Sequence, residues 1–388
     1  MLKISKTYLE QKGDSTRLCA DVSIGAREAT LWFAVDSIHA DWLALGRADG
    51  FVMALLPGAM RGKHDIVCED PMSERLHGQL VRGLIPALTF AGGQYHPIQI
   101  TAPLTSEKLL NGGAVGTGFS GGADCLYTVM SHGRDSVLPL THIAVFNNGH
   151  MGNGLQAGRN LFRIACEHAQ RFALEQSLQM VALDSNIYDT LSDRGLDVYS
   201  FRNYACGLVL GQLFSVYLLS SGHDAAHFAL DLHNSATFDL LTARCASTES
   251  LSFYHAGEEM TRVQKLIELA EWEPSWRWLH PCFRQGPDQP NCGHCKKCIR
   301  DMSTLYALKR LDRYRAVYDV DDFVRNLPQR MGVLLAHSDA HLYAEAIELL
   351  MERNIPIPPQ AYAYERQFRI AMKQLQAQTE EQRSYQGK

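Results

Sequence analysis

Four cysteines in the last third of the chain have a spacing that suits one metal ion. Cys282 is followed by Cys292, Cys295 and Cys298 in the pattern C-x9-C-x2-C-x2-C. Thiols two residues apart can point at one ion, and four thiolates match the tetrahedral preference of Zn²⁺ at closed sites. In a reducing compartment clustered thiols more often mean metal than disulfides. We therefore predict a structural Zn²⁺ knuckle at 282–298, with redox pairing of the thiols as the alternative.

A second group of residues could bind phosphate. Ser120, Gly121, Gly122 and Asp124 stand where an apolar stretch passes into a helical pattern. The glycines allow the backbone to approach an anion, and the free N–H groups and dipole of a helix start attract negative charge. Ser120 adds a hydroxyl donor, and Asp124 in the first turn could help to hold a Mg²⁺ that bridges phosphates. The alternative is an ordinary turn with Asp124 as a helix cap.

The elements that must position these residues follow an alternating pattern. From Gly113 on, apolar strands alternate with helical segments, which predicts an α/β fold with a parallel sheet covered by helices. The expected strands are 114–119, 141–147, 179–183 and 226–230, and the expected helices are 124–131, 155–174 and 204–220. This order places the glycine loop at the end of the first of these strands, where open α/β sheets bind ligands.

The rest of the chain has a different pattern. Alternating or β-branched segments at 17–24, 29–35, 50–56 and 98–101 predict a β-rich N-terminal domain. Amphipathic helices are expected at 323–337 and 342–353. We predict an N-terminal domain over 1–110, a nucleotide-binding domain with the knuckle over 111–310, and a helical C-terminal extension over 311–388.

Composition excludes several classes of function. The 388 residues are 46% hydrophobic, enough for a large core, and the net charge of −5 gives no basic surplus for nucleic acid. No apolar stretch is long enough to span a membrane, and the first residues lead into no apolar signal core. We expect a cytoplasmic protein with neither a membrane nor a nucleic-acid partner.

The glycine loop resembles the Ser-Gly-Gly-x-Asp-Ser loop of the PP-loop ATP pyrophosphatases, with Cys125 in place of the last Ser. This replacement loses a good hydroxyl donor, because a thiol is only a weak one. With the four-cysteine pattern that follows, residues 114 to 310 are similar to 7-cyano-7-deazaguanine synthase and its relatives. The resemblance implies a Rossmann-like domain of the adenine nucleotide alpha-hydrolase kind, and ATP, Mg²⁺ and Zn²⁺ as its cofactors.

The resemblance also implies further contacts to ATP. Phe146 and Asn147 end the second strand of the parallel sheet, where the similar family has a polar, glycine-containing turn. Arg202 stands where the family has an Arg-Asn pair that opens a helix, and Arg262 stands where it has a basic residue after Thr. Together with the loop from Ser120 to Cys125, these residues are the expected nucleotide site.

The implied reaction is the cleavage of ATP to AMP and pyrophosphate. It would activate a small acidic substrate, such as a carboxylated deazapurine, as its adenylate for attack by ammonia or an amine. Relatives of this family in bacterial defence attach such a deazapurine to a protein, and the N-terminal domain would suit a protein partner. The acceptor pocket is expected among residues 223–239, where Asp231, His233, Asn234 and Asp239 cluster.

Three alternatives use the same motifs. A tRNA sulfurtransferase would need a sulfur-carrying thiol, for which Cys166, Cys206 and Cys245 are available, although Cys166 and Cys206 fall on apolar helical faces. An enzyme of the glutamine-dependent asparagine synthetase type would need a cysteine at the mature N-terminus, where Leu2 stands. A non-catalytic, zinc-bearing adaptor is the third, and Cys125 is the residue that favours it.

Overall fold

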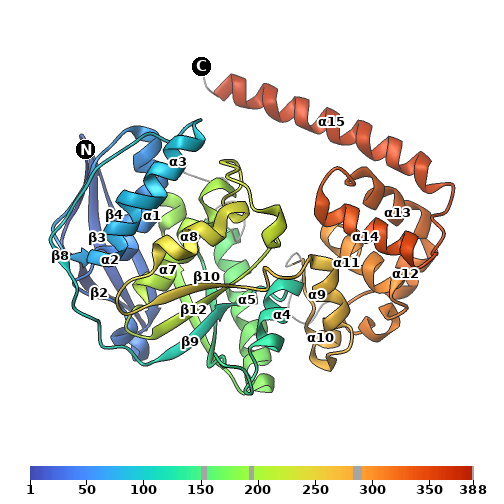
Figure 1. Cartoon of the computed structure of the whole chain (residues 1–388), viewed down its shortest axis with the longest axis horizontal. Helices are drawn as coiled ribbons and strands as arrows, with labels where there is room; N and C mark the ends of the chain where they lie inside the picture. The colour runs from blue at the N-terminus through green and yellow to red at the C-terminus, as the bar shows by residue number, and fades with distance from the viewer. Residues whose placement is uncertain (150–154, 192–195, 283–290, 387–388) are drawn as a thin grey trace. The chain divides into compact units, whose positions relative to one another are not determined.

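The computed structural model describes residues 1–149, 155–191, 196–282 and 291–386. The chain forms two compact units, drawn in Figure 1. We call Met1–Ser120 with Thr128–Glu259 the sheet unit, and Gly121–Tyr127 with Met260–Lys388 the helical unit. The boundaries expected from the sequence, at residues 110 and 310, differ from this division and stay predictions.

A parallel sheet forms the carboxyl-terminal half of the sheet unit. Its strands lie in the order β13-β12-β9-β10-β11, and all neighbours are parallel. The strands are β9 (Ala114–Gly118), β10 (His142–Phe146), β11 (Gln179–Ser185), β12 (Phe214–Ser220) and β13 (Ser252–Ala256). The predicted α/β architecture is confirmed, with a large and mostly parallel mixed sheet.

The central strand β9 is the point at which the strand order reverses. The chain passes from β9 to β10 and β11 on one side, and then returns to place β12 and β13 on the other side of β9. At such a switch point the loops that leave the carboxyl ends of adjacent strands diverge and open a crevice. The glycine loop begins directly after β9.

The N-terminal strands continue the same sheet. β4 (Arg27–Asp36) pairs antiparallel with β11, with Phe33 opposite Ser185. β3 (Ser15–Ile24) pairs with β4 over its full length, which confirms the two strands predicted at 17–24 and 29–35. The remaining strands are β1 (Leu2–Ile4), β2 (Tyr8–Lys12), β5 (Ile66–Cys68) and β7 (Ile100–Thr101), and β6 (Met72–Ser73) and β8 (Leu104–Thr105) form a separate pair.

Two apolar runs were assigned the wrong element from the sequence. Residues 50–56, predicted as a strand, lie in the buried helix α1 (Asp49–Gly62). Residues 204–220, predicted as one helix, are the end of α7 (Tyr199–Val209) followed by β12. The physical reason is the same in both: a segment buried on every side is apolar throughout, so it shows neither the helical nor the strand period.

Residues 226–230, predicted as a strand, begin instead with a 3-10 turn, Ala225–His227. The Asp224 side chain accepts a hydrogen bond from the backbone N–H of Ala226 and caps this turn. A local side-chain bond of this kind competes with strand pairing, which is why the apolar residues that follow do not join the sheet.

Helices pack on the sheet and make most of its core. α5 (Leu155–Gln176) packs on β10 and β11, α1 packs on α7, and α8 (Asp239–Ala246) packs on β13. The other helices of this unit are α2 (Glu74–Gln79), α3 (Ile85–Ala91) and α6 (Ile187–Leu191), and α4 (Ala123–Ser131) follows the glycine loop. No helix among the described residues is both long and apolar enough to cross a membrane.

The helical unit confirms the predicted C-terminal helices. The segment 323–337 is two helices, because Pro328 stands at the start of the second and fits only a first turn. The helices are α9 (Arg262–Leu269), α10 (Glu273–Trp278), α11 (Lys296–Ala307), α12 (Val320–Arg325), α13 (Leu327–Ala336), α14 (His341–Glu352) and α15 (Ala361–Gln386). α11 packs against α9, α13 and α14, so it is the centre of this unit.

Helices α13 and α15 approach so closely that only glycine fits between them. A Cβ at Gly332 would lie 2.4 Å from Cβ of Tyr364 and 2.9 Å from the carbonyl oxygen of Ala361. We expect Gly332→Ala to lower the free energy of unfolding of the helical unit by about 1–3 kcal/mol, as overpacking usually does. Urea unfolding of the full chain measures this. Gly58→Ala in α1, where a Cβ meets open space, is the control, and equal midpoints for both variants would contradict the prediction.

Candidate functional site

The glycine loop has the backbone that an anion site needs. β9 ends at Gly118 and α4 begins at Ala123, so the loop joins a strand to a helix N-terminus as predicted. Gly121 has φ of +72°, a left-handed conformation that favours glycine. Ser120 is exposed at the carboxyl end of β9. The first turn of α4 therefore follows a glycine whose backbone has the left-handed conformation.

Cys125 is turned away from solvent. Its side chain is buried, and the thiol donates a hydrogen bond to the carbonyl oxygen of Gly122 at 3.1 Å. A serine in this position could make the same bond or turn its hydroxyl to a phosphate. The thiol thus supports the loop from inside the first turn of α4.

Asp124 lies in a group of buried charges within the helical unit. Its carboxylate contacts the guanidinium of Arg262, and its other oxygen lies 3.6 Å from Nζ of Lys265. Both cationic side chains are at most 9% exposed. Asp124 and Arg262, which are 138 residues apart in the sequence, are therefore brought together. In this arrangement Asp124 neutralises two cations, while the roles predicted for it with Mg²⁺ and for Arg262 with phosphate stay predictions.

Asp301 holds the far side of Arg262. The Asp301 carboxylate accepts hydrogen bonds from Arg262 Nη2 at 3.2 Å and from Arg300 Nε at 3.0 Å, and it is fully buried. Burial alone would raise the pKa of Asp301, but the two guanidinium groups outweigh it and hold that pKa below its ordinary value. Burial likewise opposes the charge of Arg262, and Asp124 and Asp301 together keep its pKa above the ordinary value.

Two of the residues predicted to contact ATP, Phe146 and Asn147, lie in the sheet unit at the end of β10 and after it. Phe146 is buried in the core and stacks on Tyr217, with the ring centroids 5.7 Å apart. Asn147 follows β10 and donates its amide to Asp184 Oδ1 at 2.6 Å. Its side chain is thereby fixed at the carboxyl end of β10.

Arg202 is a buried cation and not a surface charge. It is 1% exposed and donates from Nη1 to the carbonyl oxygen of Asn148 at 3.4 Å. Gly149 has φ of +94°, and a Cβ there would lie 2.7 Å from the same nitrogen. The turn after β10 thus favours glycine because of this left-handed φ, and because an added Cβ would also lie 2.9 Å from Cβ of Tyr188. His150, which follows Gly149 in the sequence, lies outside the described residues.

A histidine that sequence reasoning missed lies at the end of β13. The side chain of His255 is 4% exposed, and neither ring nitrogen has a hydrogen-bond partner among the described residues. The nearest charge is Asp239, the first residue of α8, whose Oδ2 lies 3.9 Å from Nε2 and whose Oδ1 is also without a partner there. Buried polar atoms normally have partners, so this pair is suited to receive a polar molecule. Only the three-dimensional arrangement could reveal it, because a single histidine in an apolar strand has no sequence signature.

The rest of the predicted acceptor region is less suited to binding. Asp231 and His233 are exposed, and the Asn234 side chain caps the following turn by accepting a bond from the N–H of Ala236. Of the polar residues singled out in this region, Asp239 is the buried one.

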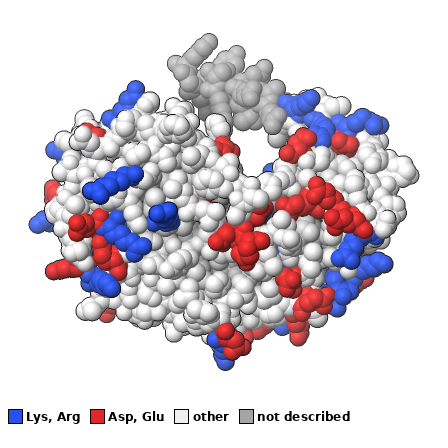
Figure 2. Space-filling view, in the orientation of Figure 1, with Lys and Arg blue, Asp and Glu red and all other residues white. Residues whose placement is uncertain are grey.

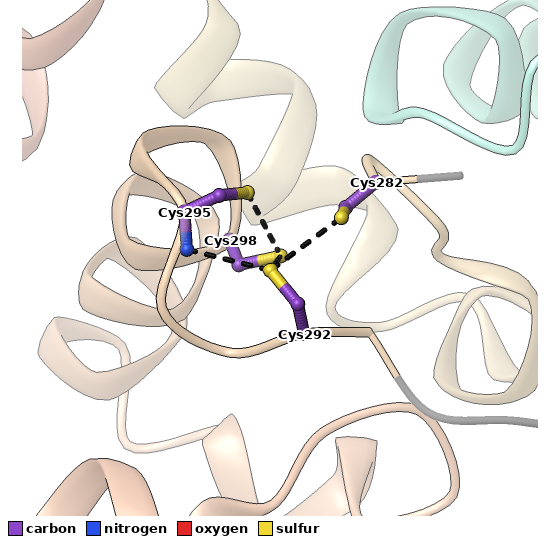
Figure 3. A group of neighbouring side chains, drawn as sticks. All are labelled: Cys282, Cys292, Cys295 and Cys298. Carbon is purple, nitrogen blue, oxygen red and sulfur yellow. Dashed lines mark hydrogen bonds between the residues drawn. The ribbon is translucent and has the colours of Figure 1, made fainter. Parts of the chain in front are cut away.

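The four predicted metal ligands lie together (Figure 3). Their sulfur atoms all lie within 4.8 Å of one another, with Cys282 and Cys292 at 3.5 Å and Cys295 and Cys298 at 3.5 Å. Gly293 turns the chain with φ of +70°, and Cys295 is the cap residue of α11. The four thiols could hold a metal such as Zn²⁺, as the spacing predicted. Residues 283–290, which carry the other turn residues of the predicted knuckle, lie outside the described part.

His280, two residues before the cluster, is buried. Burial lowers the pKa of its imidazole to about 4, so the ring is neutral at physiological pH. Its backbone N–H donates to the carbonyl oxygen of Gly121 at 2.6 Å. The segment that enters the cysteine cluster is thus bonded to the glycine loop.

No protein-family model matches the chain, and neither a curated protein nor a solved structure matches it significantly. The resemblance to the PP-loop ATP pyrophosphatases therefore rests on the glycine loop, the cysteine cluster and the residues between them.

Proposed function

We propose that this chain is an ATP-dependent adenylating enzyme with a Rossmann-like PP-loop domain and a structural zinc knuckle. The observation that carries the proposal is the position of the Ser120–Asp124 loop. It joins β9 to the N-terminus of α4, and β9 is the strand at which the order of the parallel sheet reverses. Helix N-termini at such junctions commonly bind phosphate through their backbone N–H groups and the helix dipole.

The proposed reaction has two steps. An oxygen of the substrate carboxylate attacks the α phosphorus of ATP, the bond from that phosphorus to the bridging oxygen of the β phosphate breaks, and pyrophosphate leaves. The amine nitrogen then attacks the acyl carbon of the adenylate, the bond from that carbon to the phosphate oxygen breaks, and AMP leaves with loss of a proton from the nitrogen. The substrate class, an acidic deazapurine-like compound, comes from the resemblance.

The chain's own residues would bind the leaving pyrophosphate. The Ser120 hydroxyl and the N–H groups of Gly121 and Gly122 are the donors, and donors fixed before the reaction stabilise charge as it develops. Mg²⁺, where bound, would further neutralise the phosphates, and Asp124 is the residue predicted to help hold it. Asp124 keeps Arg262 and Lys265 in place beside this loop.

Measuring AMP and pyrophosphate release tests the proposal. We expect both products in equal amounts when the zinc-loaded protein is given ATP, Mg²⁺ and a carboxylated deazapurine with ammonia or a primary amine. A protein that binds no ATP and forms no AMP with any such acid would refute the enzyme.

The non-catalytic adaptor is the second candidate, and the thiol bond of Cys125 to Gly122 favours it. Here the hydroxyl that the family carries is absent, and the thiol is directed to the loop itself. The turnover of one variant, Cys125→Ser, distinguishes the adenylating enzyme from the adaptor. If the wild-type protein is inactive and Cys125→Ser gains turnover, the adaptor is correct; if the wild type turns over, it is not.

A sulfurtransferase is disfavoured by the surroundings of its candidate cysteines. A sulfur carrier needs an accessible thiol with a low pKa, because the thiolate is the nucleophile. Burial raises the pKa of Cys166 to about 12 and that of Cys206 still further, and Cys206 is fully buried. Cys245 is buried as well, and its pKa is also raised by burial.

The charge pattern of one face agrees with a small-molecule substrate. On the face drawn in Figure 2, acidic and basic side chains form small groups of both signs. Nucleic-acid binding proteins instead gather Lys and Arg into one patch or stripe. A protein partner for the N-terminal strands is part of the proposal and is not needed for the adenylation step.

Asp239 and His255 are our candidates for contacts to the attacking amine. An imidazole beside a carboxylate can accept a proton from the nucleophile, a step that typically contributes 10²–10⁴-fold. We expect Asp239→Asn and His255→Gln each to slow amine-dependent AMP formation by about 10²-fold while the affinity for ATP stays the same. His233→Gln, at an exposed position, is the control. Parallel losses of ATP affinity and turnover would contradict this role.

A further inference from the structure

The cysteine cluster is bonded to the glycine loop from both of its ends. His280, two residues before Cys282, donates its backbone N–H to the carbonyl oxygen of Gly121. Asp301, three residues after Cys298, binds Arg262, which in turn contacts Asp124. All of these contacts lie within the helical unit, to which the loop residues Gly121–Tyr127 also belong.

The connection through Asp301 is rigid. Its carboxylate is fully buried and accepts one hydrogen bond on each oxygen, from Arg262 and from Arg300. The guanidinium of Arg300 lies over the ring of Tyr343 on α14, 5.4 Å from its centroid. A buried carboxylate with both oxygens bonded to planar cations has a single arrangement. A change in the position of α11 therefore moves Arg262.

The start of α11 is where the metal ligands lie. Cys295 caps the helix, Cys298 lies in its first turn, and Asp301 lies one turn further on. A Zn²⁺ ion that draws four thiolates into a tetrahedron fixes the direction of this first turn relative to Cys282. It thereby fixes the distance from Asp301 to the segment that carries His280.

We infer that metal binding at the four cysteines sets the conformation of the glycine loop, with Asp301 and Arg262 as positioning residues that transmit it to Asp124. The phosphate site is then available only while the knuckle is loaded. Chelation of the metal, or oxidation of the thiols to disulfides by a peroxide, disables the loop, so the knuckle is a regulatory site as well as a structural one. In each disulfide formed, two thiolates would lose two electrons and release their metal ion. The peroxide would take up these electrons and two protons from solvent, giving two waters, or an alcohol and a water.

Hydrogen exchange of the full-length protein tests the inference without any need for ATP. The measured quantity is amide exchange in residues 119–127, compared with residues 343–350 of α14. We expect removal of Zn²⁺ with a chelator to speed exchange in 119–127 at least tenfold. Asp301→Asn should give the same increase with Zn²⁺ still bound and with 343–350 unchanged. Asp312→Asn, on an 82% exposed side chain in the same unit, is the matched control and should change neither segment.

Several outcomes would overturn the inference. Unchanged exchange in 119–127 for zinc-loaded Asp301→Asn would do so, as would an equal increase in both segments with zinc retained. If Asp301→Asn does not fold, Arg262→Lys replaces it, since it keeps the charge but loses the fork that joins Asp124 to Asp301, and the same criteria apply.

Only one part of this inference, its consequence for the phosphate site, rests on the proposed function. A measurement of ATP binding distinguishes the inference from that function. With ATP as the probe, we expect Asp301→Asn to bind at least tenfold more weakly than the wild type. If the wild type binds no ATP but the exchange result holds, the adenylating function fails and the coupling stands. If ATP binds equally well to the wild type and to zinc-loaded Asp301→Asn, the coupling fails and the function stands.

Discussion

Asp124→Asn is expected to lower the rate of AMP and pyrophosphate formation by about 10²–10³-fold, because the donors of the glycine loop lose their fixed position, which costs about as much as removing one oxyanion donor. The reason lies in its two partners. Without the carboxylate, Arg262 and Lys265 lose a counter-charge that both contact, and both are almost completely buried. An unbalanced buried charge is costly, so the two cations will rearrange and the first turn of α4 with them.

The measurement is single-turnover formation of AMP at saturating ATP, so that loss of chemistry is separated from loss of binding. Asp135→Asn, an exposed position between α4 and β10, is the control and should react at the wild-type rate. Equal rates for Asp124→Asn and the wild type would show that the loop at Ser120–Asp124 is not the reacting site.

Cys295→Ser should remove the bound zinc and unfold the region around the start of α11. A hydroxyl is a poor ligand for Zn²⁺, and three thiolates bind more weakly than four. Structural zinc sites contribute about 10–16 kcal/mol of apparent binding free energy at neutral pH, which is folding free energy when the site does not exist in the unfolded chain. Because α11 packs against α9, α13 and α14, the loss will spread through the helical unit.

Zinc content by elemental analysis and thermal unfolding by circular dichroism measure this effect. We expect about one zinc per chain in the wild type, none in Cys295→Ser, and a lower melting temperature for the variant. His294→Gln, an exposed neighbour inside the same turn, should keep both the metal and the melting temperature. Retained zinc in Cys295→Ser would mean that the four thiols are not the ligand set.

The parts of the structure that the sequence predicted well are those determined by local patterns. The position of the glycine loop at a strand-to-helix junction could be predicted because its residues occur together in one short segment. The clustering of the cysteines could be predicted because their spacing in the sequence is short. The run 204–220 failed for the opposite reason: it is buried on all sides, so its helix and its strand have the same composition.

The contacts around Asp124 could not be predicted, because they join distant segments. Arg262 was singled out by its place after Thr261, but its bonds to Asp124 and Asp301 depend on how α9 and α11 pack. Lys265 and His255 were missed altogether. A buried lysine or histidine looks like any other in the sequence, and only its burial and the charge beside it distinguish it.

The pairing of β4 with β11 has a consequence for the parallel sheet. A chain that began near residue 111 would leave the end of β11 as an open edge, because β4 pairs with its last two residues, Asp184 and Ser185. Such an edge readily pairs with another chain and leads to aggregation. The ten-residue ribbon of β3 and β4 covers this end of the edge, independently of any partner that its outer surface binds.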